Sequence, residues 1–122
     1  MSISLTDIYQ AKQRIEPYIT KTPLIRLQKL DEFLHCQVYV KAECMQLTGA
    51  FKLRGALNKI LKLSPEQIQC GIVAASSGNH GRAVAYTAKM LGTSATIVMP
   101  FSAPAIKVQA IKELGAKVVQ CD

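Results

Sequence analysis

The stretch that decides the fold reads Ile72-Val73-Ala74-Ala75-Ser76-Ser77-Gly78-Asn79-His80-Gly81. Four apolar residues are followed at once by six small or polar ones, and apolar residues then recur at positions 84, 85, 88 and 91, which is a helical spacing. We therefore expect a strand over 72–75, a loop, and a helix over 80–91. Such a loop ends in unpaired backbone N–H groups at a helix N-terminus, where an anion is favoured. In open α/β sheets, ligands bind at this carboxyl end of a strand.

The alternation of strand and helix continues toward the C-terminus. A strand is expected over 95–99, a helix over 104–114 and a strand over 116–120, with Gly92 and Gly115 where helices should end. Strands that alternate with helices predict a parallel sheet with right-handed crossovers.

The segment before residue 70 is less regular. Ser4 to Asp7 is typical of a helix start, and Pro17 breaks the helical pattern that follows. Extended pieces are expected over 24–27 and 37–43, and helices over 28–34 and 51–63. We expect the two extended pieces to lack sheet neighbours and to expose apolar faces.

Lys52 lies in a second distinctive stretch, Leu47-Thr48-Gly49-Ala50-Phe51-Lys52-Leu53-Arg54-Gly55-Ala56. Thr48 and Gly49 suit a tight turn and a helix entry. Phe51 and Leu53 flank the amine with apolar side chains, and we expect them to desolvate it partly. A neutral amine attacks an aldehyde to form a Schiff base. A surface lysine on the first turn of a helix is the more ordinary interpretation, and Lys52 alone does not overturn it, so both interpretations stay open here.

Together the two stretches resemble the fold-type-II pyridoxal-phosphate enzymes, in their serine racemase and threonine dehydratase branch. Residues 48–56 are similar to that branch's cofactor-lysine motif and residues 76–81 to its asparagine loop, and the likeness runs from about Thr6 to the last residue. The resemblance implies an α/β fold whose open parallel sheet has helices on both faces. It covers the N-terminal portion only: residues 1–69 would belong to the large domain, and residues 70–122 would begin the small α/β domain.

The resemblance also implies roles for individual residues. Lys52 would bind pyridoxal 5'-phosphate, Phe51 would lie against it, and Asn79 would hydrogen-bond its 3′ oxygen. The substrate carboxylate would be held by Ser76, Ser77, Asn79 and His80. Racemisation needs two proton-transfer groups on opposite faces of the substrate Cα, and Lys52 and Ser77 would be that catalytic pair.

The activity that the resemblance implies is racemisation of L-serine or a related hydroxy amino acid, α,β-elimination from it, or both. Ser77 favours the racemase side, because many threonine dehydratases that resemble this chain have alanine there. Ala50 departs from the family pattern, which commonly has serine before Phe51 and Lys52. Two alternatives stay open: a threonine or hydroxyaspartate ammonia-lyase, and a non-catalytic fragment of such an enzyme.

Composition narrows the possible partners. The 15 basic residues exceed the 8 acidic ones and give a net charge of +7, but they are dispersed with no basic run, so we expect no nucleic-acid partner. No stretch is long enough to cross a bilayer, and residues 1–10 lack the features of a signal peptide, so we expect a cytoplasmic protein without membrane contact. The four cysteines show no metal-ligand or disulfide spacing.

Two further expectations come from the resemblance. The full-length form would be a homo-oligomer, a dimer, acting on a small amino-acid substrate. The family holds the cofactor phosphate in a glycine-rich loop, whereas no two of the seven glycines here are adjacent. We therefore expect the 122-residue chain not to catalyse by itself.

Overall fold

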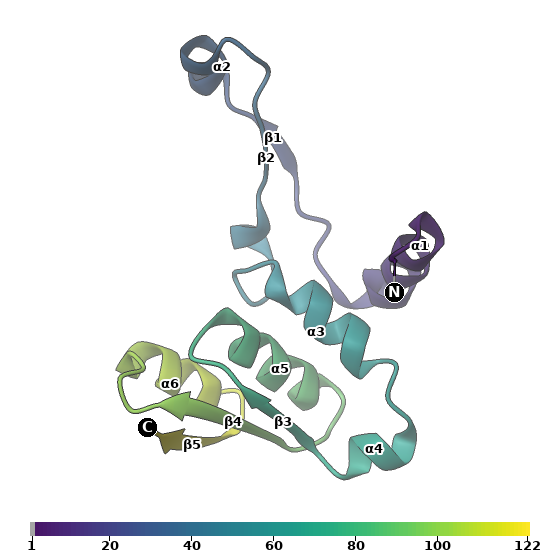
Figure 1. Cartoon of the computed structure of the whole chain (residues 1–122), viewed down its shortest axis with the longest axis vertical. Coiled ribbons are helices and arrows are strands. Elements are labelled where there is room, and N and C mark those ends of the chain that lie inside the picture. Colours follow the sequence, from purple (N-terminus) through teal and green to yellow (C-terminus); the bar gives the residue numbers. More distant parts are fainter. Residues whose placement is uncertain (1) are drawn as a thin grey trace.

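The computed structural model describes residues 2–122, and the C-terminal half is built around a parallel three-stranded sheet (Figure 1). The strands lie in the order β3-β4-β5, so neighbours in the sheet are also successive strands of the chain. A helix joins each strand to the next, as the sequence pattern predicts. In chain order these elements are β3 (Ile72–Ala75), α5 (Asn79–Met90), β4 (Ala95–Pro100), α6 (Ala105–Lys112) and β5 (Lys117–Cys121).

Both connecting helices pack on the same face of this sheet. On that face Ala95, Ile97 and Met99 of β4 are buried, whereas Val73, which points to the other face, is 73% exposed. Because strand order follows chain order, two right-handed crossovers run in one direction and place both helices on one side. The predicted α/β class with a parallel sheet is confirmed. The expected second layer of helices on the opposite face is not present among residues 2–122 (Figure 1).

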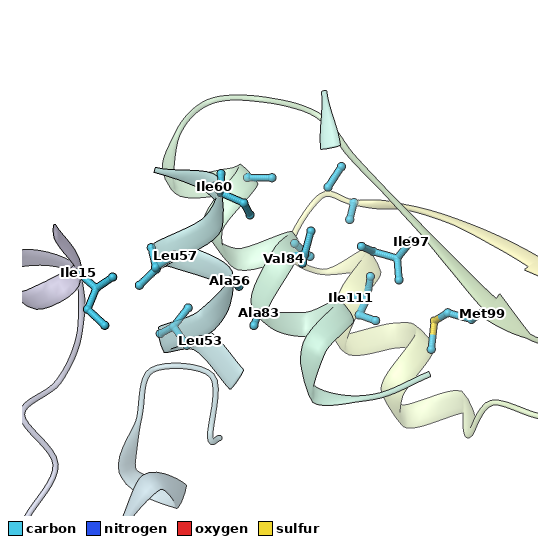
Figure 2. Packing of buried hydrophobic residues seen from close by; sticks show 14 residues of the cluster. Ile15, Leu53, Ala56, Leu57, Ile60, Ala83, Val84, Ile97, Met99 and Ile111 are labelled. Atoms are coloured by element: carbon cyan, nitrogen blue, oxygen red, sulfur yellow. The ribbon is translucent and has the colours of Figure 1, made fainter. Parts of the chain in front are cut away.

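The helix that begins at Lys52, α3 (Lys52–Ile60), packs against α5 on the side away from the sheet (Figure 2). Leu53 and Leu57 of α3 are fully buried, and burying a leucine side chain stabilises a fold by about 1.5–3 kcal/mol. In turn α1 (Leu5–Ile15) packs on α3 through the buried Ile15. One continuous apolar core therefore links the N-terminal helices to the sheet. The helix predicted over 51–63 is confirmed with tighter bounds.

Residues 24–41, which we call the arm, extend away from this core (Figure 1). The two arm strands pair with each other in antiparallel register, so the expectation that they would lack sheet neighbours is wrong. A short helix between the two strands reverses the direction of the chain, as antiparallel pairing of successive strands requires. The expected exposure of apolar side chains in the two pieces is confirmed, since Leu24 is 63% and Tyr39 50% exposed. The arm consists of β1 (Leu24–Arg26), α2 (Gln28–Leu34) and β2 (Tyr39–Lys41).

One short helix, α4 (Pro65–Gln69), lies outside the predicted elements. The Ser64 hydroxyl accepts a hydrogen bond from the Gln67 N–H, and the Gln67 side chain accepts one from the Ser64 N–H. This capping box, with a proline at the first helical position, can be read from the sequence. Ser4 and Asp7 form the same device at the predicted start of α1. The remaining regular pieces are the 3-10 turns η1 (Glu16–Tyr18) and η2 (Glu43–Met45).

Three further properties bear on the class of protein. Within residues 2–122, no helix combines the length and the apolar composition needed to span a membrane. The four cysteines are unpaired and lie at the surface. In the described part of the chain, no three His, Cys, Asp or Glu side chains gather in a way that could hold a metal ion.

Candidate active site

Lys52 is the first residue of α3 and points out of the core. The turn before it needs glycine, because Gly49 has a φ of +69°, in the left-handed region that other residues rarely adopt. Leu53, one step further along the helix, turns into the core and is fully buried. Lys52 is exposed, with its Nζ 4.9 Å from the centre of the Phe51 ring, and Phe51 is itself 58% exposed. The expected desolvation by Phe51 and Leu53 is therefore wrong within this chain.

A hollow of about 410 Å³ opens beside the Lys52 amine. Phe51, which precedes α3, lines it together with Lys52 and Arg54 of α3, and His80 lines it from the first turn of α5. Gly55 leaves space in its wall, since an added Cβ would meet no atom within 4 Å. The packing of α3 on α5 thus brings together three of the residues singled out in the sequence.

The loop between β3 and α5 is shaped by Ser76 and Gly81. The Ser76 hydroxyl oxygen accepts hydrogen bonds from the N–H groups of Gly78 and Gly81, at 3.3 and 3.0 Å. A Cβ on Gly81 would lie 2.9 Å from Ile97 Cγ2 and 3.1 Å from the Ser76 carbonyl oxygen, so only glycine fits. Among the described residues, the N–H groups of Ser77, Asn79 and His80 have no acceptor. They are the donors that a helix N-terminus offers to an anion.

Asn79 lines a second hollow, of about 260 Å³, rather than the one beside Lys52. Arg82 and Lys107 line it too, and no acidic residue does. The Lys107 Nζ lies 3.9 Å from the position a Cβ on Gly78 would take. Ser77 is exposed and borders neither hollow. His80 thus lines the hollow beside the Lys52 amine, whereas Asn79 and Ser77 do not.

Sequence reasoning missed Arg82 and Lys107 as site residues. A signal was available for Lys107, which lies in the first turn of the helix that follows β4. Because β3 and β4 are parallel neighbours, residues that follow their carboxyl ends meet at one edge of the sheet. Arg82 Nη1 lies 3.9 Å from the Cβ position of Gly49, so it stands between the Lys52 turn and the second hollow.

A polar network supports α3 just beyond Lys52. The Arg54 guanidinium donates to both carboxylate oxygens of Glu43, from Nε at 2.9 Å and from Nη2 at 2.7 Å. These bonds, with a third from the Thr22 hydroxyl, lower the pKa of Glu43 to about 2 against the opposing effect of burial. No sequence signal marked this pair, because its members lie eleven positions apart, across a turn and the start of a helix.

The residues present fit the reactive side of a pyridoxal phosphate. An exposed amine borders a hollow, an exposed aromatic ring can cover one face of the cofactor ring, and unused N–H groups and two cations can meet anionic groups. The buried Thr48 hydroxyl also finds no partner among residues 2–122, which leaves a polar atom of the Lys52 turn unused.

Comparison with known proteins agrees with this arrangement. Residues 15–122 match the family described as pyridoxal-phosphate dependent enzyme. The catabolic L-threonine dehydratase TdcB of Staphylococcus aureus (strain USA300) is 53% identical over 118 residues, which is 96% of this chain and 34% of that protein. The chain therefore spans about a third of the length of the curated relatives it matches.

Two solved structures are similar over nearly the whole chain. Maize serine racemase superimposes with a TM-score of 0.95 at 41% identity, covering 100% of this chain and 37% of that one. The serine racemase from Dictyostelium discoideum gives a TM-score of 0.92 at 42% identity, covering 98% and 39%. Because the family match runs through the Lys52 turn and the 76–81 loop to the last residue, this chain belongs to the family of pyridoxal-phosphate dependent enzymes.

Proposed function

We propose that this chain carries the cofactor lysine and the substrate-binding loop of an enzyme that racemises L-serine, eliminates water from it, or does both. The central observation is that the exposed Lys52 amine, the Phe51 ring and His80 border one hollow, next to a loop with unused N–H groups. Similarity to a serine racemase and to a threonine dehydratase supports these reaction types.

Each residue has a distinct role in this proposal. Lys52 Nζ binds the cofactor covalently and later moves a proton at the substrate Cα, and Phe51 packs against the cofactor ring. When bound, pyridoxal phosphate supplies an electron sink for the charge left at Cα. Asn79 donates a hydrogen bond to the 3′ oxygen of the cofactor ring.

The 76–81 loop binds the substrate carboxylate in this scheme. The backbone N–H groups of Ser77, Asn79 and His80 are its donors, helped by the positive end of the α5 dipole. The Ser76 oxygen already accepts two N–H bonds, so its own proton is what it can offer to the carboxylate. The Ser77 hydroxyl serves as the proton-transfer group opposite Lys52, which racemisation needs.

The proposal extends to the whole protein in three respects. Residues 1–69 belong to the large domain and residues 70–122 begin the small one. The substrate is a small hydroxy amino acid, and the full-length form is a homodimer. These points draw on the family resemblance and on the small share of its relatives that the chain covers.

Chemical trapping tests the role of Lys52. After loading with pyridoxal phosphate, sodium borohydride should fix the label on Lys52, identified by peptide mapping, and Lys52→Ala should abolish both label and turnover. Lys59→Ala is the matched control, because Lys59 is another exposed lysine of α3. A label on Lys41 or Lys59 in the unaltered protein would overturn the assignment.

Ser77→Ala in the full-length protein separates the two reactions. Loss of the second proton-transfer group should lower the rate of D-serine formation by about 10²–10⁴-fold, while elimination, which uses Lys52 alone, should persist. Chiral analysis of serine and a pyruvate assay measure the two. Equal loss of both activities would mean that Ser77 only binds the carboxylate.

A threonine or hydroxyaspartate ammonia-lyase is the second candidate, favoured by the 53% identity to a threonine dehydratase. It predicts 2-oxobutanoate from L-threonine, or oxaloacetate from hydroxyaspartate, without D-serine from L-serine. A non-catalytic role for the 122-residue chain predicts no turnover on any of these substrates after pyridoxal phosphate is added.

A further inference from the structure

We propose that Gln46 and the Glu43–Arg54 pair are positioning residues, which clamp the Lys52 turn at both ends onto residues 20–22. This inference rests on the proposed function of Lys52. It goes beyond that role by assigning a task to Gln46 and Glu43, which do not line the hollow, and to Arg54, which borders it and is held by Glu43.

The first clamp lies before the turn and is made by Gln46, which is 4% exposed. Its Oε1 accepts hydrogen bonds from the N–H groups of Thr20 and Leu47, at 2.9 and 3.1 Å. Its Nε2 donates to the Thr20 carbonyl oxygen at 3.0 Å. The buried Gln46 side chain therefore fixes the start of the turn to both the N–H and the carbonyl group of Thr20.

The second clamp lies two residues after Lys52. The bidentate Arg54–Glu43 pair is joined by Thr22, whose hydroxyl donates to Glu43 Oε1 at 2.6 Å and whose side chain is 3% exposed. A forked pair of this kind fixes orientation as well as distance. The helix entrance is thereby tied to the same segment that holds Gln46.

No side-chain cap restrains this end of the helix, although the buried Leu53 holds its inner face. Phe51 occupies the N-cap position of α3 and makes no side-chain capping bond, so the first turn lacks the usual protection from fraying. Lys52 belongs to that turn. The clamps replace a cap, which explains why buried polar groups gather around an exposed lysine.

Reactivity should depend on this restraint, because misplacing a reacting group by 1 Å can lower a rate by about 10²-fold. Glu43→Gln keeps the side-chain shape and weakens the forked pair. Arg54→Lys keeps the positive charge but cannot form the bidentate pair with Glu43. If Arg54 acts through its charge alone, this variant should behave like the unaltered protein, and if it positions the turn, it should not. Gln46→Glu removes the N–H donor to the Thr20 carbonyl oxygen. It tests the first clamp independently, and so keeps the inference testable if Glu43→Gln fails to fold.

The matched control is Arg26→Gln, which breaks the Arg26–Asp31 pair of the arm. That pair has the same 2.7 Å separation as Arg54–Glu43 but lies away from the turn, with Arg26 45% exposed. Three measurements are made on the full protein: amide hydrogen exchange of the peptide 46–55 without cofactor, the rate of borohydride-trapped labelling of Lys52, and kcat with KM.

For all three clamp variants we expect faster amide exchange in the peptide 46–55 and slower labelling of Lys52. We also expect kcat to fall about 10–100-fold while KM changes less than about threefold. None of these changes is expected for Arg26→Gln. Unchanged exchange and labelling in the clamp variants, or rescue by Arg54→Lys, would overturn the inference. If the unaltered protein never labels at Lys52, the proposed function fails, and the exchange data alone then decide whether the clamps hold the turn.

Discussion

The arm and the core are held together by different forces, although they belong to one short chain. In the core, Leu53 and Leu57 are fully buried and pack across α3 and α5. In the arm every strand residue is exposed, and order comes from backbone pairing and from the Asp31 carboxylate, which accepts from Arg26 and from the Val38 N–H. A two-stranded pair alone is marginal in water.

This difference between the arm and the core indicates which interactions make the candidate active site rigid. The Lys52 turn lies where the two regions meet, with the core behind Leu53 and the base of the arm beside Glu43 and Gln46. Apolar burial fixes the helix, and buried hydrogen bonds fix its entrance. Substitutions should therefore have very different consequences in the two regions.

The largest expected effect is a cavity in the core. Leu57→Ala should lower the free energy of unfolding of the chain by about 2–5 kcal/mol, because a fully buried side chain is removed. The matched change in the arm is Leu34→Ala, where the side chain is 51% exposed and a loss within about 0.5 kcal/mol is expected. Urea unfolding of both variants measures the difference. Equal losses would mean that the arm is packed against another surface in solution.

A second comparison concerns two helical glycines. Gly81→Ala should cost about 1–3 kcal/mol by overpacking, because the new methyl would press on Ile97 and on the Ser76 carbonyl. Gly55→Ala, also in a helix but with open space around it, should stabilise by about 0.5–1 kcal/mol. Thermal unfolding tests both, and destabilisation by Gly55→Ala would contradict the open space seen there.

Much of the core was predictable from local patterns. The apolar run at 72–75, the polar loop after it and the helical spacing beyond give the strand, loop and helix in the observed order. Lys52 at the start of a helix follows from Gly49 and the apolar pattern after it. These features depend on neighbours in sequence, which is the information that a sequence pattern holds.

What could not be predicted depends on residues far apart in the chain. Tertiary packing sets the pairing of β1 with β2 and the bonds of Gln46 to Thr20, and it places Asn79 and Lys52 at the walls of different hollows. The expectation of a desolvated Lys52 failed for a related reason. Adjacent residues on a helix point in different directions, so the buried Leu53 does not cover its neighbour.

A smaller effect is expected from pH at the junction of the arm and the core. The folded-state pKa of Glu43 is about 2, below its ordinary value of 4.5, so its stabilising contribution is complete above pH 4.5 and is lost as pH falls toward 2. Glu43→Gln lacks this contribution, so its stability deficit should shrink over that range. Asp31→Asn in the arm should show the same direction, because the Val38 N–H and then Arg26 lower the pKa of that carboxyl, and a smaller size, because Arg26 is more exposed than Arg54. A deficit independent of pH would argue against the charged pair.

The smallest effect is expected at the tip of the arm. His35 ends α2 with a φ of 53°, the only non-glycine residue of 2–122 in the left-handed region, a conformation that costs about 1 kcal/mol or more for a residue with a Cβ. His35→Gly removes that strain but gives the unfolded chain more freedom, so a net gain of a few tenths of a kcal/mol is expected. Since the arm can open without the core, the gain should appear as slower amide exchange over 28–41 with the overall unfolding midpoint unchanged. Gly115→Ala is the mirror control in the core: with a φ of +83° and no atom within 4 Å of the new methyl, it should lose stability through backbone strain alone. Faster arm exchange in His35→Gly would mean that the histidine side chain stabilises the tip by more than its backbone strain costs.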